Sequence, residues 1–189
     1  MRKLKLQVQM TIDGFIGGPD GEMDWMTLPW SKDITEYVDD ITQPIACIVL
    51  GRKLAEGFIP YWTSVAADPH HPEMYAGKKF TETPKIVFTK TLQESPWAYT
   101  TVSAGDVATE IGQLKSREGG DIMAYGGRQF VASLLRAQLV DELNLFVNPT
   151  AIGRGQAIFA ELEGYAAFSL QQVIRFDCGI VLLQYVKRN

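Results

Sequence analysis

The chain has 189 residues, of which 46% are hydrophobic and 21% charged, and its formal net charge is -4. This length suits one domain with a sizeable core, so we expect residues 1–189 to form a single domain, and the composition carries no sign of disorder. The acidic balance argues against nucleic-acid binding through a general basic field, but it leaves room for a local cationic pocket that holds a small phosphorylated molecule.

The first third of the chain predicts a strand, a loop, a helix and a second strand. Apolar and polar residues alternate at 4–10, which predicts a strand that runs into the glycine-rich loop TIDGFIGGPDGEMDW. Ser31 is a suitable N-cap for a helix over residues 32–41. The apolar run IACIVL ends at Gly51 and is typical of a buried parallel strand, and a short helix over residues 52–57 should follow it.

The rest of the chain predicts further strands that alternate with helices. Residues 60–83 carry several prolines and aromatics, and we expect a long surface excursion there. KIVFT and AYTTV predict strands, DVATEIGQLKSR a helix, DIMAY a strand that stops at two glycines before an amphipathic helix, and DELNLFVN another strand. The tail predicts two antiparallel strands that turn near residues 177–179. This order favours an α/β fold with a mostly parallel central sheet flanked by helices and a C-terminal antiparallel hairpin.

Glycines stand at the ends of three predicted strands, in VLGRK, AYGGRQ and IGRGQ, and a fourth strand end, FTKT, places hydroxyls around a lysine. Ligands of α/β sheets bind beyond the carboxyl ends of the strands, where helix N-termini present free N–H groups. A single glycine after a strand is more often a plain turn, but together these ends describe a rim for an anionic ligand with several phosphates.

Each part of this rim suits a different part of such a ligand. Gly126 and Gly127 let a pyrophosphate lie against the backbone at a helix start, and Arg52 and Lys53 supply charge for a terminal phosphate, for which a 2′-phosphate is the natural candidate. The chain has neither a Walker A motif nor a complete GxGxxG, which excludes an ordinary P-loop or Rossmann site.

The chain resembles the dihydrofolate reductase-like superfamily over nearly its whole length, through the motifs LQVQMTIDGFIGGPDGEMDW, VLGRKLAEGFIPYW, KIVFTKTL and DIMAYGGRQFVASLLRAQLVDELNLFVNPTAIGRGQAIF. Within that superfamily it is most similar to the C-terminal reductase domain of bifunctional riboflavin-biosynthesis proteins and its stand-alone bacterial relatives. The resemblance implies a dihydrofolate reductase-like fold, NADPH as the cofactor, hydride transfer to a pterin-like or ribosylamino-pyrimidine substrate, and a homodimer.

The resemblance also implies the residues that contact the cofactor. Those that meet the 2′-phosphate and the pyrophosphate are Gly51, Arg52, Lys53, Gly126, Gly127, Arg128 and Gln129. Those at the adenosine end are Thr89, Lys90 and Thr91, and those that flank the nicotinamide are Ile16, Gly17 and the backbone of Gln9. Leu54 stands where the family pattern has a threonine, which removes one hydrogen bond to phosphate, of order 1 kcal/mol.

Acidic and aromatic residues near the first predicted helix are the candidates for the substrate side. True dihydrofolate reductases place a carboxylate early on this helix, and LPWSKDITEY has Asp33 at nearly that place, with Glu36 one turn later. Asp33 either acts on the substrate, by pairing with an amino-pyrimidine edge or relaying a proton, or stabilises the helix dipole. Asp13 either contacts substrate or forms an Asx turn. Trp25 either walls the pocket or packs in the core.

The remaining patterns argue against a metal site and against a membrane protein. In DPHHPEM the adjacent histidines point opposite ways, and DGEMDW lacks the glycine that a calcium loop has at its sixth position. With no signal-peptide pattern and no apolar segment of membrane length, we expect a cytoplasmic protein. The leading hypothesis is an NADPH-dependent reductase, and the alternative is a non-catalytic or weakly active nucleotide-binding relative of the same fold.

Overall fold

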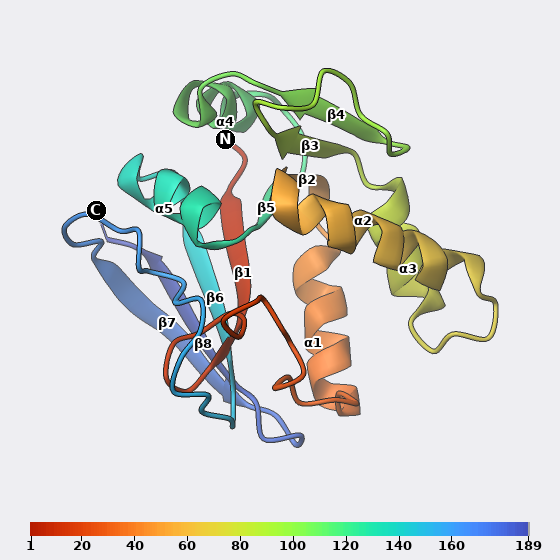
Figure 1. The fold of residues 1–189 in the computed structure, drawn as a ribbon, viewed down its shortest axis with the longest axis vertical. Coiled ribbons are helices and arrows are strands. Elements are labelled where there is room, and N and C mark those ends of the chain that lie inside the picture. Colours follow the sequence, from red (N-terminus) through yellow and green to blue (C-terminus); the bar gives the residue numbers. More distant parts are fainter. Residues whose placement is uncertain (189) are drawn as a thin grey trace.

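Figure 1 shows the computed structural model of the chain, which describes residues 1–188. Within these residues an 8-stranded sheet has the order β4-β3-β2-β5-β1-β6-β8-β7. The strands are β1 Leu4–Thr11, β2 Ile45–Gly51, β3 Lys85–Phe88, β4 Thr100–Ser103, β5 Asp121–Tyr125, β6 Glu142–Asn148, β7 Phe168–Arg175 and β8 Val181–Lys187. The helices are α1 Lys32–Thr42, α2 Arg52–Ala67, α3 Met74–Glu82, α4 Val107–Ser116 and α5 Arg128–Arg136.

The strand directions confirm the predicted architecture. β4, β3, β2, β5, β1 and β6 pair in parallel with one another, and β8 and β7 add an antiparallel hairpin at the edge beyond β6. Parallel neighbours need crossover connections, which helices supply here except between β3 and β4, where residues 89–99 connect the two strands without a helix. In β1, buried residues alternate with half-buried ones, as its sequence pattern predicts.

Helices cover both faces of the sheet (Figure 1). α4 and α5 pack on one face, where Ile111, Val131 and Leu134 are fully buried in one cluster with residues of β1 and β5. On the other face α1 lies over β6 and β8, and α2 and α3 lie over β2, β3 and β5. β2 and β5 are neighbours, yet the helices that follow them lie on opposite faces. An α/β sheet accepts ligands at such a point, beyond the carboxyl ends of the two strands.

The segment 60–83 is where the sequence-based prediction was wrong. It holds the second half of α2 and all of α3 instead of a surface excursion, so the helix predicted over residues 52–57 is also much longer than expected. Pro60 lies inside α2, where its missing N–H removes a helix hydrogen bond. Packing outweighs that loss: Trp62 of α2 stacks on Phe80 of α3 with ring centroids 4.5 Å apart, and Phe80 is buried against the sheet.

A helix that crosses a membrane or a cluster of metal-ligating side chains would indicate another class of protein. Among residues 1–188, the helices include none that is both long enough and apolar enough to cross a membrane. The same part of the chain brings no three side chains of His, Cys, Asp or Glu together as a potential metal site.

Candidate functional site

A cavity of about 630 Å³ lies at the carboxyl ends of β2 and β5, where the helices that follow leave for opposite faces. Its walls come from the starts of α2 and α5, from the turns after β3 and β4, and from the loops that follow β1 and β6. Its described lining residues are Pro19, Gly51, Arg52, Lys53, Phe88, Thr89, Lys90, Thr91, Ser103, Ala104, Gly105, Val107, Gly127, Arg128, Gln129, Phe130, Ser133, Gly155 and Gln156. Most of the residues predicted to contact a cofactor therefore line one cavity.

Two helices begin at this cavity with glycine N-caps. Gly51 precedes α2 and Gly127 precedes α5, and neither helix start donates an N–H hydrogen bond to a capping side chain. The first N–H groups of a helix have no partner inside it, and the helix dipole makes this end attractive to anions. α4 differs, because the Asp106 side chain accepts a hydrogen bond from the Thr109 N–H and so caps its first turn. The starts of α2 and α5 are thus suited to hold phosphate groups.

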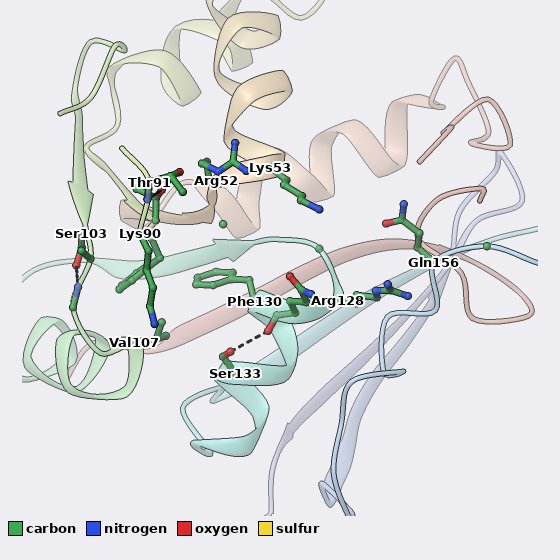
Figure 2. A pocket seen from close by; sticks show the side chains of 18 of the residues that line it. Arg52, Lys53, Lys90, Thr91, Ser103, Val107, Arg128, Phe130, Ser133 and Gln156 are labelled. Carbon is green, nitrogen blue, oxygen red and sulfur yellow. Dashed lines mark hydrogen bonds between the residues drawn. The ribbon is translucent and has the colours of Figure 1, made fainter. Parts of the chain in front are cut away.

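Four basic side chains surround these helix starts, and Figure 2 shows them along the cavity. Two are paired with glutamates: Arg52 with Glu56 one turn later on α2, and Arg128 with Glu161, at 3.4 Å between Nε and Oε1. The other two, Lys53 and Lys90, are exposed. The rings of Phe88 and Phe130, which also line the cavity, lie 5.6 Å apart at 31° and give it an apolar surface.

The turn after β3 is held by its own hydroxyls. The buried Thr89 accepts hydrogen bonds at its Oγ1 from the N–H groups of Thr91 and Leu92, at 3.2 and 3.3 Å. This arrangement is a local side-chain turn, and it presents the exposed side chains of Lys90 and Thr91 at the cavity wall. The FTKT motif therefore lines the cavity, and its contact with a cofactor stays a prediction.

The remaining predicted cofactor residues do not line the cavity directly. Ile16 and Gly17 form backbone hydrogen bonds with Gln156, which does line it. The Gln9 side chain accepts a hydrogen bond from the buried Asn148 at 2.9 Å. Gly126 faces Phe130, and a Cβ there would lie 2.5 Å from the ring. Their contact with a cofactor stays a prediction.

Leu54, which stands in place of a threonine, packs against the apolar cluster of α2, α3 and β2. It is not among the lining residues of the cavity.

Asp33, the predicted catalytic residue, is engaged by structural contacts. Its Oδ1 accepts hydrogen bonds from the Ser31 hydroxyl at 2.5 Å and the Ile34 N–H at 2.9 Å, and its Oδ2 accepts one from the Asp177 N–H at 2.9 Å. The Ser31 hydroxyl above all, and the two N–H groups, lower the pKa of the Asp33 carboxyl. Asp33 therefore ties the start of α1 to the turn of the β7–β8 hairpin, and its role in proton transfer stays a prediction.

The other predicted substrate residues lie apart from the cavity lining. Glu36 is exposed and pairs with Lys32 on the same helix, at 3.2 Å. Trp25 is buried, and its indole N–H donates to the carbonyl of Glu22 at 3.1 Å, which favours packing over the walling of a pocket. Asp13 binds the backbone of the loop after β6. For all three residues, contact with a substrate stays a prediction.

Several lining residues were absent from the sequence-based prediction of the site. Ser103 ends β4, and Ala104 and Gly105 follow it; β4 pairs with β3 at the edge of the sheet. The same rule that selected the other strand ends, a small or hydroxyl residue directly after a strand, also applies to SAGD. Gly155 and Gln156 belong to the IGRGQ motif, which the sequence placed on the rim without assigning these two residues a role.

The sheet order and the cavity at its carboxyl edge define a dihydrofolate reductase-like α/β fold. The chain belongs to the RibD C-terminal domain family, whose model matches residues 2–182. It is 27% identical over 187 residues to the uncharacterized protein YyaP of Bacillus subtilis strain 168, covering 97% of this chain and 94% of that one. It is 24% identical over 186 residues to the uncharacterized protein YwjB of the same organism, covering 98% of each.

Solved structures agree with this assignment. The "Putative riboflavin biosynthesis protein" of Shewanella sp. PV-4 matches with a TM-score of 0.77 at 19% identity, over 100% of both chains. A diaminohydroxyphosphoribosylaminopyrimidine deaminase/5-amino-6-(5-phosphoribosylamino)uracil reductase of Thermotoga maritima matches with a TM-score of 0.71 at 17% identity, over 99% of this chain and 57% of that one. These likenesses establish the fold, and family membership together with reductase neighbours supports a reductase-like role.

Proposed function

We propose that this protein is an NADPH-dependent reductase that transfers hydride to a small heterocyclic substrate, either pterin-like or a ribosylamino-pyrimidine. The observation that carries the proposal is the cavity itself, which gathers the glycines, cations and hydroxyls at the ends of β2, β3, β4 and β5 around two open helix N-termini. Such a set of donors suits a dinucleotide that carries several phosphates. Family membership and the reductases among the structural neighbours support the choice of reaction.

The residues present fit NADPH. The N–H groups at the start of α5 and the Arg128 guanidinium would hold the pyrophosphate, and Arg52, Lys53 and Lys90 would hold the 2′-phosphate. A bound NADPH would supply the hydride, which is chemistry that no protein side chain provides. The task of the chain is to bind the two ligands, orient them and keep water from the reacting atoms.

Binding of NADPH and NADH to the purified protein tests the cofactor. Titrations followed by fluorescence and thermal shift should show NADPH binding more tightly than NADH, because the 2′-phosphate adds charge-assisted hydrogen bonds. Arg52→Ala should reduce this preference by about tenfold, as expected for the loss of a hydrogen bond to a charged group. Arg136→Ala is the matched control, since Arg136 pairs with Glu163 and does not line the cavity. Absence of binding of either nucleotide contradicts the proposal.

Turnover assays test the substrate. NADPH oxidation should be measured with dihydrofolate and with the deaminated riboflavin-pathway pyrimidine, the substrate class named for the Thermotoga maritima neighbour. The Asp33→Asn variant, measured in the same assays, tests whether this carboxylate takes part in proton transfer. If Asp33 relays a proton, kcat should fall while NADPH affinity stays unchanged. Unchanged kcat removes that role and leaves Asp33 with the structural contacts to Ser31 and Asp177.

One observation favours the second candidate, a nucleotide-binding relative with little or no turnover. Among the described residues, those that line the cavity contribute no carboxylate and no imidazole for proton transfer. Tight NADPH binding without oxidation in the presence of either substrate would support this alternative over the reductase.

A further inference from the structure

Two loops at the carboxyl ends of β1 and β6 are joined into one unit, which we call the loop clamp, made of residues 11–18 and 150–158. Phe15 and Ala157 form an isolated antiparallel bridge. On one side of that bridge, the Ile16 N–H donates to the Gln156 carbonyl and the Gln156 N–H donates to the Gly17 carbonyl, both at 2.9 Å. These bonds satisfy backbone groups of loops that are far apart in sequence and otherwise irregular.

Asp13 fastens the other end of the loop clamp. Its Oδ2 accepts hydrogen bonds from the N–H groups of Ile152 at 3.1 Å and Gly153 at 2.7 Å, and its Oδ1 accepts one from the Thr11 hydroxyl at 2.5 Å. The Thr11 hydroxyl foremost, and the Gly153 and Ile152 N–H groups as well, lower the pKa of the Asp13 carboxyl. Asp13 is therefore ionised at neutral pH and accepts charge-assisted hydrogen bonds from the second loop.

Close packing fastens the loop clamp in its middle. A Cβ at position 155 would lie 2.3 Å from the Gly17 carbonyl oxygen, so only glycine lets the two backbones approach this closely. Gly17 and Gly155 are thus complementary parts of one contact. Any larger residue at 155 would separate the loops even though Asp13 is intact.

The loop clamp forms one wall of the cavity. Gly155 and Gln156 line the cavity together with Pro19, which follows the first loop directly. Figure 2 shows Gln156 at the opposite end of the cavity from Ser103 and Lys90. A ligand short enough to occupy only the end near Lys90 would not reach this wall, whereas a dinucleotide that spans the cavity would meet it.

We propose that Asp13 is a positioning residue that holds the Gly155–Gln156 wall in place for the far half of a bound dinucleotide, and that it does not itself contact the substrate. The proposal rests on the proposed function and deepens it, because it assigns affinity for the nicotinamide half to a residue outside the cavity. Asp13 acts through the backbone of Ile152 and Gly153, and the wall follows three residues later in the same loop.

The test compares NADPH with adenosine 2′,5′-bisphosphate, a fragment that lacks the nicotinamide half, in calorimetric titrations of the full chain. Asp13→Ala should weaken NADPH binding about tenfold, the effect of losing hydrogen bonds to a charged acceptor, and leave the affinity for the fragment within about twofold. Asp24→Ala is the control, because it removes the same charge from an exposed position in the same glycine-rich loop. Gly155→Ala should reproduce the split between the two ligands with Asp13 in place.

Hydrogen exchange supplies a readout that does not depend on a ligand. The backbone amides of residues 150–158 should exchange faster in Asp13→Ala, while those of β1 and β6 keep the wild-type rate. Equal weakening of both ligands, or a fall in kcat with unchanged NADPH affinity, overturns the proposal. So does unchanged exchange in the loop.

Failure of the proposed function has a different signature. If the wild type binds neither NADPH nor the fragment, the cofactor assignment fails, while the exchange rates in residues 150–158 still decide whether Asp13 holds the loop.

Discussion

Gly126 and Gly127 stand side by side between β5 and α5, and the structure gives them different reasons to lack a side chain. A Cβ on Gly126 would lie 2.5 Å from the Phe130 ring, so this glycine serves the packing of α5. Nothing lies within 4 Å of a Cβ on Gly127, and its φ of -74° is open to any residue. Neither packing nor backbone strain explains the second glycine, and under the proposed function it leaves space for a ligand at the start of α5.

Substitution of Gly127 should therefore affect ligand binding, and substitution of Gly126 should affect the stability of the fold. Gly127→Val should keep the wild-type melting temperature and abolish NADPH binding, because its side chain fills the space at the helix start where a pyrophosphate would lie. Gly126→Val should lower the free energy of unfolding by about 1–3 kcal/mol, the usual cost of overpacking. Chemical denaturation and NADPH titration of both variants measure the two effects. A stable Gly127→Val protein that still binds NADPH with wild-type affinity would refute the assignment of this helix start.

At the scale of the element, the sequence predicted the strands and helices whose own residues follow a regular apolar pattern. β1, β2, β5 and β6 were predicted from alternation or continuous apolar runs, and α5 from its amphipathic pattern after two glycines. α3 was missed because it is held by a ring stacked on another helix and by a lysine of the next strand, and no periodic pattern within the helix reveals either contact. Phe80 stacks on Trp62, and the Lys85 ammonium of β3 donates to the carbonyls of Phe80, Thr81 and Thr83 at 2.7–2.9 Å, which closes the helix end.

The candidate site likewise contains residues that local motifs predicted and residues that only the fold brings together. Motifs such as GRK, TKT and GGRQ were predicted as ligand positions because each combines a strand end with glycine, charge or hydroxyl. Ser103 and Gly105 satisfy the same strand-end rule, but the pairing of β4 with β3 brings them to the cavity, and the order of strands in a sheet has no local signal. The contacts of Asp33 with Asp177 and of Asp13 with Gly153 each join residues more than a hundred positions apart, so no spacing rule reveals them.

The connection between β6 and β7 is tied to α5 by two ion pairs of similar geometry. Arg128 pairs with Glu161 at 3.4 Å, and Arg136 pairs with Glu163 at 3.2 Å. Only Arg128 lines the cavity. A phosphate that binds Arg128 would therefore compete with Glu161. Glu163 is also a glutamate paired with an arginine of α5, but its partner Arg136 does not line the cavity, so Glu163 would not compete with the ligand.

Glu161→Gln should consequently tighten NADPH binding by about two- to fivefold, the range that corresponds to an exposed ion pair of up to about 1 kcal/mol. Glu163→Gln should leave the affinity unchanged. The difference between the two variants should shrink in high salt, because exposed charges are screened. Titrations at two ionic strengths measure this, and equal tightening by both variants would show a general charge effect in place of competition for Arg128.

At the scale of the whole molecule, the cavity lies where the chain reverses its progress across the sheet. The chain moves outward from β2 through β3 to β4 and then returns to insert β5 between β2 and β1. The cavity walls therefore come from connections that are spread along the chain, from Pro19 to Gln156. A ligand that contacts all of them would add a cross-link between the two halves of the sheet, which the pairing of β2 with β5 and the hydrophobic clusters on the two faces already join.

This arrangement predicts how the intact protein unfolds with and without ligand. If residues 1–189 form one domain, circular dichroism and tryptophan fluorescence should report the same single thermal transition, since Trp62 and Trp30 pack in clusters under different helices. NADPH at about one hundred times its Kd should add about 2.7 kcal/mol to the free energy of unfolding. For a chain of this length that shifts the melting temperature by roughly 5–10 °C. Two separate transitions, or a shift confined to one probe, would mean that the ligand stabilises only part of the sheet.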